Sequence, residues 1–266
     1  MVTIYKDYQD EPEDIFRLLP ADLSCQLYHL EMKDFTEDIA FYQKLLPAKC
    51  NILEMGCGTG RVSRALADTN HTVTGIDISL PMLQIARQNS LSHCRYVCMD
   101  MTAPAFSRNF DTILIPYNTL NLLSRPSQLK QCVQSCHSLL HDSGQLIVQI
   151  FIPNEKKLSQ PEKTFQFQLF DRPEGGKIVK EIVQSYNAET QTMQVEERFR
   201  IRPMQKGDNN ADYHSLYTIR AWNSKQWLDF LTDSCFSPVH IYGDYSFSSF
   251  NSTKSTCLLV VLEKVS

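Results

Sequence analysis

A glycine-rich turn between an apolar run and a helix-forming run is the feature of this 266-residue chain that most restricts its fold. The stretch ILEMGCGTGRVSRALA, residues 52–67, places Gly56, Gly58 and Gly60 within five positions. Glycine accepts positive φ and lets a ligand approach the backbone, and the helix that follows points unpaired N–H groups at that ligand. The sequence therefore predicts a ligand-binding strand–turn–helix unit rather than a bare turn.

Apolar strands alternate with helices over the first 152 residues. We expect helices at 36–46, 60–69, 79–90 and 125–144, and strands at 51–55, 71–78, 94–100, 110–117 and 145–152. Gly144 is expected to end the last of these helices. Short apolar strands that alternate with helices predict an α/β fold whose parallel sheet is covered on both faces.

The pattern changes after Pro153, where apolar and polar residues alternate as they do in antiparallel strands. We expect strands at 165–171, 177–187, 192–201 and 212–222, a helix at 223–234 capped by Asn223 or Ser224, and final strands at 237–245 and 255–264. The interpretation is a single domain over 1–266. Its parts are an N-terminal lid segment at 1–35, a core at 36–153 and 223–266, and an antiparallel insert subdomain at 160–222.

Composition excludes several classes of function. The chain is 42% hydrophobic and 21% charged with a net charge of −4, which is typical of a globular protein and gives no broad basic face for nucleic acid. No apolar run approaches the ~20 residues that span a bilayer, and the acidic N-terminus lacks the apolar core of a signal peptide. We therefore expect a cytoplasmic protein with no membrane or nucleic-acid partner.

Nine cysteines in a chain without a secretion signal predict reduced thiols. Cys94 with Cys98, and Cys132 with Cys136, are the pairs that raise a metal hypothesis. The second pair also falls on the apolar stripe of the expected helix at 125–144, where free cysteine behaves as a small buried hydrophobe. Zinc sites usually show closer ligand pairs such as C-x2-C, so we favour a packing role and expect no metal.

The spacing around the turn narrows the choice of ligand. A phosphate-binding P-loop needs a lysine after its last glycine, and none is present here. A dinucleotide fingerprint has the spacing G-x-G-x-x-G, whereas the third glycine here is one place early and Arg61 stands at the fingerprint position. Glu54 would repel a pyrophosphate but suits a ligand that carries an ammonium group.

Two further acids lie at the ends of expected strands. Asp77 follows Gly56 by 21 residues and ends the second strand, where a carboxylate normally binds ribose hydroxyls. Asp100 ends the third strand, where a carboxylate can accept from an adenine amino group. Since open α/β sheets bind ligands at the carboxyl ends of their strands, these acids and Glu54 predict an adenosine-type ligand.

With these features the chain resembles the class I S-adenosylmethionine-dependent methyltransferases. The matching segments are ILEMGCGTGR (52–61), VTGIDIS (73–79), VCMDMT (97–102), FDTILIPYNTLNLL (110–123) and LLHDSGQLIVQIF (139–151). The resemblance implies a Rossmann-like seven-stranded, mostly parallel sheet with helices on both faces and an antiparallel seventh strand. It also implies an inserted antiparallel β-sheet lid after strand five and S-adenosylmethionine as cofactor.

The resemblance carries cofactor roles onto particular residues. The glycine turn with Glu54 would hold the methionine part, Asp77 with Ile78 the ribose, and Asp100 with Met101 the adenine. The N-terminal segment would close over the cofactor through Tyr5 and Tyr8. The full expected cofactor set is Tyr8, Glu54, Gly56, Gly58, Gly60, Arg61, Asp77, Ile78, Asp100, Met101 and Pro116.

The sequence narrows the methyl acceptor to a class of molecules rather than to one compound. The segment IPYNTLNLL lacks the N-P-P-Y or D-P-P-Y sequence found in enzymes that methylate DNA or protein amides, and the pI near 6.0 disfavours a polyanion. The insert resembles the lid of small-molecule methyltransferases, including those acting on amino sugars and glycine-like amines. We therefore expect methyl transfer to the N or O of a small molecule by a monomer or homodimer.

The catalytic groups are the weakest part of the sequence prediction. Related small-molecule enzymes often place a histidine after strand four, where this chain has asparagines. The candidates are Tyr117, Asn118, Asn121 and His214. Two other functions stay open, a protein or RNA methyltransferase and a non-catalytic S-adenosylmethionine-binding module. An NAD-linked oxidoreductase is disfavoured by the glycine spacing.

Overall fold

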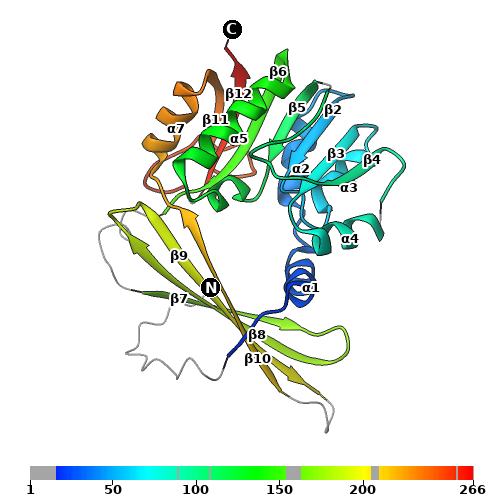
Figure 1. Ribbon diagram of the computed structural model, residues 1–266, viewed down its shortest axis with the longest axis vertical. Coiled ribbons are helices and arrows are strands. Elements are labelled where there is room, and N and C mark those ends of the chain that lie inside the picture. Colours follow the sequence, from blue (N-terminus) through cyan, green and yellow to red (C-terminus); the bar gives the residue numbers. More distant parts are fainter. Residues whose placement is uncertain are drawn as a thin grey trace.

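A computed structural model describes residues 16–88, 90–107, 109–153, 163–204, 210–255 and 257–265. In this part of the chain the strands form one seven-stranded and one five-stranded sheet. In Figure 1 the seven-stranded sheet lies above the five-stranded one. Tyr5 and Tyr8 lie outside the described residues. No described helix is long and apolar enough to cross a bilayer.

The seven-stranded sheet has the order β11-β12-β6-β5-β2-β3-β4. Its strands are β2 (Asn51–Met55), β3 (Thr72–Asp77), β4 (Cys94–Cys98), β5 (Phe110–Ile115), β6 (Leu140–Phe151), β11 (Phe236–Tyr242) and β12 (Cys257–Lys264). The strands from β4 to β6 run parallel, whereas β12 runs antiparallel to both β6 and β11. The Rossmann-like sheet with an antiparallel last strand is therefore confirmed.

Helices cover both faces of this sheet. They are α2 (Glu37–Leu45), α3 (Arg61–Ala67), α4 (Leu80–Gln88), α5 (Pro126–Leu139), α7 (Ser224–Asp233) and the 3-10 helix η2 (Thr119–Leu122). α5 and α7 bury apolar side chains against one face, and α2, α3 and α4 do so against the other. Asn223 caps α7, because its side chain accepts from the Gln226 N–H.

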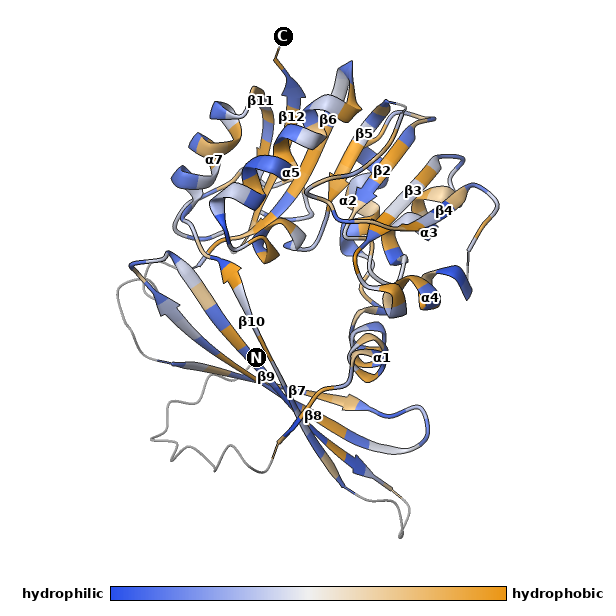
Figure 2. Cartoon of the chain, in the orientation of Figure 1, coloured by the Kyte–Doolittle hydropathy of each residue, from blue (hydrophilic) through white to orange (hydrophobic). Residues whose placement is uncertain are grey.

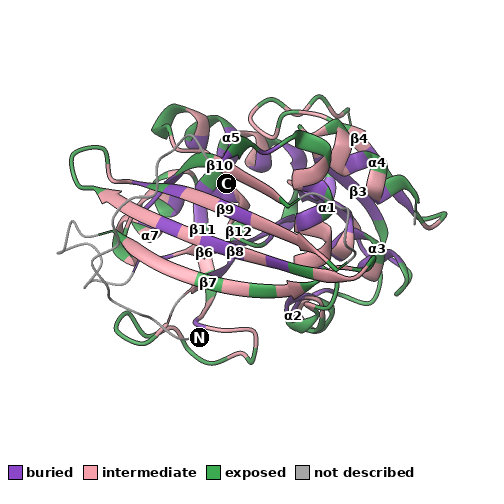
Figure 3. Cartoon of the chain, turned by 90° about the horizontal axis from the view of Figure 1, so that it is seen from below, coloured by how far each residue is buried: buried purple, intermediate pink, exposed green. Residues whose placement is uncertain are grey.

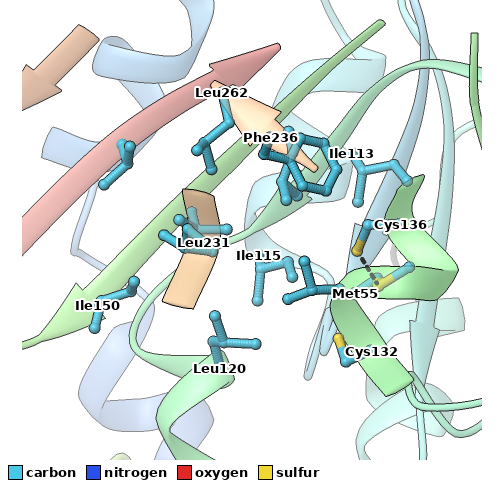
Figure 4. Packing of buried hydrophobic residues seen from close by; sticks show 14 of the residues in the cluster. Met55, Ile113, Ile115, Leu120, Cys132, Cys136, Ile150, Leu231, Phe236 and Leu262 are labelled. Atoms are coloured by element: carbon cyan, nitrogen blue, oxygen red, sulfur yellow. Dashed lines mark hydrogen bonds between the residues drawn. The ribbon is translucent and has the colours of Figure 1, made fainter. Parts of the chain in front are cut away.

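Cys132 and Cys136 lie in the first of these apolar layers. Both side chains are fully buried, and the Cys136 Sγ atom lies 3.7 Å from Met55 Sδ on β2 (Figure 4). Ile113, Ile115, Leu120, Ile150, Leu231, Phe236 and Leu262 complete the residues labelled there. The two thiols thus serve as packing groups between α5 and the sheet.

The expected helix at 125–144 is wrong at its end. α5 stops at Leu139, and β6 begins at Leu140, which pairs with Phe110 on β5. Leu140 is fully buried in the sheet. Tertiary packing therefore makes this segment a strand, although its local sequence favours the end of a helix. Gly144 lies inside the strand, where a Cβ would come within 3.2 Å of the Asp111 carbonyl oxygen.

The five-stranded sheet has the order β1-β10-β9-β8-β7. Its strands are β1 (Arg17–Leu18), β7 (Thr164–Asp171), β8 (Gly176–Asn187), β9 (Thr192–Pro203) and β10 (Ala211–Arg220). β7 to β10 are antiparallel neighbours, as the alternation predicts, and β1 adds a parallel edge. Figure 2 shows the difference in hydropathy between its alternating strands and the apolar strands of the upper sheet. Seen from below in Figure 3, the edge strand β7 carries exposed positions.

Helix α1 (Ala21–Met32), which the sequence did not predict, lies between the two sheets (Figure 1). Its Leu27 packs with Ile178 and Phe199 of the five-stranded sheet. Its Cys25 Sγ lies 3.9 Å from Ser79 Oγ, beside the start of α4. α1 therefore connects the insert to the edge of the upper sheet that carries the glycine turn.

Candidate functional site

The glycine turn joins β2 to α3 with all three glycines at positive φ, 72° at Gly56, 53° at Gly58 and 75° at Gly60. The Gly56 N–H donates to the Ile76 carbonyl oxygen at 2.8 Å, which fixes the turn to β3. A Cβ at Gly56 would overlap Thr119 Cγ2, and one at Gly60 would overlap the Tyr96 hydroxyl. These two glycines are thus required by packing as well as by φ.

Gly58 differs from the other two. A Cβ there would meet only the Tyr28 ring of α1, at an ordinary contact distance of 3.6 Å. Gly58 is buried under α1, and packing there leaves space for a methyl group, so its φ of 53° is the main reason for glycine at this position. His29 of α1 also reaches the turn, since its Nδ1 lies 3.3 Å from Thr59 Oγ1.

Asp77 organises this edge of the sheet from the end of β3. Its Oδ2 accepts from the Gly58 N–H at 2.8 Å, and its Oδ1 accepts from the Ser79 N–H at 2.8 Å. Each carboxylate oxygen has a second lone pair, so the group can still accept from ribose hydroxyls. The next residue, Ile78, has 73% of its surface exposed, which offers an apolar face for a purine ring.

Asp100 and Met101 follow β4 at the same edge. The exposed Asp100 uses Oδ1 to accept from the Thr102 N–H and hydroxyl, both at 2.8 Å. Met101 packs against the main apolar core. Two carboxylates that can accept from ribose hydroxyls and an amino group, together with the exposed Ile78 side chain, fit an adenosine ligand at this edge.

Glu54 is buried beneath the turn, with 2% of its surface exposed. Burial raises the pKa of its carboxyl to about 8, although the hydrogen bond that it accepts from Ser63 Oγ opposes the shift. At neutral pH the group is therefore mostly protonated in the absence of a bound cation. An ammonium group placed against it would favour the ionised form.

Arg61, the first residue of α3, is held by an ion pair. Its two Nη atoms donate to the Asp38 carboxylate at 2.7 and 2.6 Å, and Nη1 also donates to the Phe35 carbonyl oxygen at 2.7 Å. Asp38 is fully buried at the start of α2. Arg61 thus lies beside the turn, but its guanidinium binds Asp38 and Phe35 and so connects α2 to the turn.

The segment after β5 is held in an unusual conformation. Tyr117 and Asn118, which follow the buried Pro116, have φ of 49° and 61°, values that cost non-glycine residues free energy. The Gln149 Oε1 atom accepts from the Tyr117 N–H at 2.8 Å and from the Tyr245 hydroxyl at 2.5 Å. Sequence reasoning missed Gln149, although a glutamine in an otherwise apolar strand was a visible signal.

The remaining catalytic candidates are not brought together. Asn121 is fully buried, and its side chain bonds the Phe151 N–H and the carbonyl oxygens of Phe151 and Arg220. His214 lies next to Tyr213 on β10, so the two side chains project from opposite faces of the sheet. Because Tyr213 packs with α1, His214 points away from α1 and lies 3.7 Å from Glu196 Oε1.

Comparison with known proteins adds independent findings. Residues 52–144 match the family model described as a methyltransferase domain. The chain is 32% identical over 126 residues to a putative methyltransferase, YqeM, of Bacillus subtilis, covering 46% of this chain and 51% of that protein. It is 26% identical over 147 residues to dTDP-3-amino-3,6-dideoxy-alpha-D-glucopyranose N,N-dimethyltransferase of Streptomyces fradiae, covering 54% of each. The matched stretches thus span about half the length of these relatives.

Solved structures extend the likeness across the whole chain. DesVI of Streptomyces venezuelae matches with a TM-score of 0.75 at 16% identity, covering 92% of this chain and 98% of that one. The chain has the fold of the class I S-adenosylmethionine-dependent methyltransferases. The sugar N-methyltransferase KedS8 of a Streptoalloteichus species matches with a TM-score of 0.69 at 13% identity, covering 99% of this chain and 98% of that one.

Proposed function

We propose that this protein transfers a methyl group from S-adenosylmethionine to the nitrogen or oxygen of a small molecule. The observation that carries the proposal is the hydrogen bond between Asp77 and the Gly58 N–H. This bond holds the glycine turn against the carboxylate that would bind ribose. The likeness to an amino-sugar N,N-dimethyltransferase supports a small acceptor.

The described residues would divide the cofactor among them. The glycine turn and the Glu54 carboxylate would hold the methionine part, Asp77 the ribose and Asp100 the adenine. When bound, S-adenosylmethionine supplies an electrophilic sulfonium methyl group. Tyr117, held by Gln149, presents a half-exposed ring beside this space, and aromatic faces stabilise nearby cations.

The chain's own contribution to rate would be orientation and exclusion of water. α1 covers the glycine turn through Tyr28 and His29, and the five-stranded sheet packs on α1. We infer that α1 and the insert together act as the lid over the reacting groups. The lone pair of an acceptor enclosed there would attack the methyl carbon in line with the methyl–sulfur bond, which breaks and leaves S-adenosylhomocysteine. The acceptor's proton would pass to a neighbouring base.

The two alternative functions, a protein or RNA methyltransferase and a non-catalytic binding module, predict other features. A protein or RNA methyltransferase would need an extended acceptor groove, and the net charge of −4 offers an RNA chain no attraction. A non-catalytic module would not need Tyr117 held by Gln149 at positive φ. The proposal places the enzyme in the cytoplasm, where the nine cysteines, all free here, would stay reduced.

Calorimetry with S-adenosylmethionine, S-adenosylhomocysteine and NAD tests the proposal and the role of Asp77. We expect both adenosyl ligands to bind. In Asp77→Asn the loss of charge-assisted hydrogen bonds, worth about 1.5–3 kcal/mol, should weaken their binding by roughly 10- to 100-fold. Asp68→Asn, an exposed position after α3, is the matched control and should bind normally. Binding of NAD alone would refute the proposal.

Glu54 predicts a proton linked to cofactor binding. At pH 7 a carboxyl with a pKa of about 8 is mostly protonated, so an ammonium placed against it should release up to about one proton. We expect this release for S-adenosylhomocysteine when its binding is measured in two buffers of different ionisation enthalpy. Affinity should rise with pH as Glu54 ionises and level off above its pKa.

Two controls isolate Glu54 as the source of that proton. Glu54→Gln keeps an acceptor for Ser63 and should abolish the release. 5′-Methylthioadenosine lacks the ammonium group and should release no proton from the unsubstituted protein. Equal release from the unsubstituted and Glu54→Gln proteins would show that Glu54 does not face the ammonium.

A further inference from the structure

A polar stripe interrupts the face of the five-stranded sheet that packs on α1. Lys180 pairs directly with Phe199, and Tyr217 pairs with Val195, so these side chains share the face that carries the apolar contacts. One apolar cluster, with Phe199, contacts α1, and another, with Val195, lies toward the upper sheet. Lys180 and Glu197 lie between them, where removal from water costs free energy unless the charges are used.

The charges in the stripe do not cancel. The Lys180 Nζ atom lies 2.8 Å from Glu31 Oε2 on α1 and 2.8 Å from Glu197 Oε1. Lys180 is buried, and the two glutamate side chains are 19% and 18% exposed. One carboxylate would suffice to join α1 to the sheet through Lys180. The second leaves a net negative charge in a place with little water.

A further acceptor atom lies next to this charge. Gln168 on β7 is the register partner of Lys180, so it shares the same face. Its Oε1 atom is buried and has no hydrogen-bond partner among the described residues. A buried carbonyl oxygen without a donor is costly, and a ligand that brings N–H groups would satisfy it.

The stripe lies on the same side of α1 as the glycine turn. Tyr28 and Glu31 are three residues apart on α1, so they share one face of the helix within a single turn of about 5.4 Å. Tyr28 approaches Gly58, while Glu31 reaches Lys180. Tyr117 feels the charges of the stripe: burial raises the pKa of its hydroxyl, Glu31 raises it further, and Lys180 opposes the shift.

We propose that Glu31, Lys180 and Glu197, with Gln168, Tyr117 and Tyr217, form the methyl-acceptor subsite, and that it selects small cationic amines over neutral and anionic molecules. The Tyr217 hydroxyl donates to Glu197 Oε1 at 3.3 Å, which orients that carboxylate beside its half-exposed ring. The net negative charge, the unsatisfied Gln168 oxygen and the tyrosine rings all favour an ammonium group. This inference rests on the proposed function, since it assumes a methyl donor at the glycine turn.

The test measures charge preference in the protein loaded with S-adenosylhomocysteine. The probes are D-glucosamine against D-glucose, and cyclohexylamine against cyclohexanol, titrated by calorimetry. We expect each amine to bind at least about 10-fold tighter than its alcohol, and Glu31→Gln and Glu197→Gln each to remove most of that preference. Glu174→Gln, in the exposed turn before β8, should leave it unchanged.

The outcomes separate a binding role from a structural one. If Glu31→Gln and Glu197→Gln lower the melting temperature but keep the preference for amines, the cluster only fastens α1 to the sheet and the inference is wrong. Lys180→Met, which leaves both carboxylates, should retain or increase the preference, and its loss would also contradict the inference.

The inference and the proposed function can fail separately. If S-adenosylhomocysteine binds but neither amine does, the acceptor inference is overturned and the proposed function stands. If S-adenosylhomocysteine does not bind, the proposed function fails first, and the inference fails with it.

Discussion

Gly56→Ala is expected to prevent folding, whereas Gly58→Ala is expected to fold and to lose cofactor binding. At Gly56 the new methyl group would overlap Thr119 Cγ2, in addition to the strain of φ at 72°. At Gly58 only strain applies, about 1–2 kcal/mol, because the nearest atom is 3.6 Å away. That methyl group would stand against the Tyr28 ring of α1 and shift the turn that would hold the methionine part of the cofactor.

Thermal unfolding and calorimetry with S-adenosylhomocysteine distinguish the two variants. Gly58→Ala should show a cooperative transition a few degrees below that of the unsubstituted protein, together with at least a roughly 10-fold loss of affinity. Adding Thr119→Ser to Gly56→Ala removes Cγ2 and should recover part of the folded protein. Normal affinity in a folded Gly58→Ala protein would exclude this turn as the cofactor site.

This pair of glycines illustrates what sequence could and could not predict. A short segment of sequence predicts the turn and Asp77, because local geometry sets the spacing between the strand, the glycines and the acid. That Gly56 faces Thr119 while Gly58 faces Tyr28 depends on segments more than 25 residues away in sequence. Local spacing therefore predicts a glycine turn but not which of its glycines is crowded by distant side chains.

The proposed acceptor subsite was harder to predict because the faces of its side chains depend on strand register. Glu197 and Lys180 look like ordinary alternating charges until the pairing of β8 with β9 places them on the face that meets α1. The same parity places His214 on the opposite face from Tyr213 and Tyr217. A shift of one residue along the strand thus decides whether a side chain faces α1 or the opposite side of the sheet.

Helix α1 was missed for a related reason. Its stabilising contacts come from two distant partners, the five-stranded sheet through Leu27 and the glycine turn through Tyr28. The sequence predicts a lid over 1–35 through Tyr5 and Tyr8, which lie outside the described residues, and does not predict this helix. Helices held by tertiary packing rather than by propensity leave a weak local signal.

Arg61→Met is expected to destabilise the protein by about 3–5 kcal/mol, because it leaves the Asp38 carboxylate buried without its partner. Asp38 has no exposed surface, and both of its oxygens accept from Arg61. Denaturant unfolding should therefore show a lower midpoint with an unchanged slope. Arg64→Met, an exposed position one turn along α3, is the matched control and should shift the midpoint little.

The double variant Asp38→Asn with Arg61→Gln tests whether Arg61 also binds the cofactor. Replacing the buried pair with neutral hydrogen-bonding groups should recover much of the lost stability, because no uncompensated charge remains. If Arg61 acts only by connecting α2 to the glycine turn, S-adenosylhomocysteine affinity should recover along with stability. A double variant that is stable but binds at least about 10-fold more weakly would instead place the Arg61 guanidinium in contact with the cofactor.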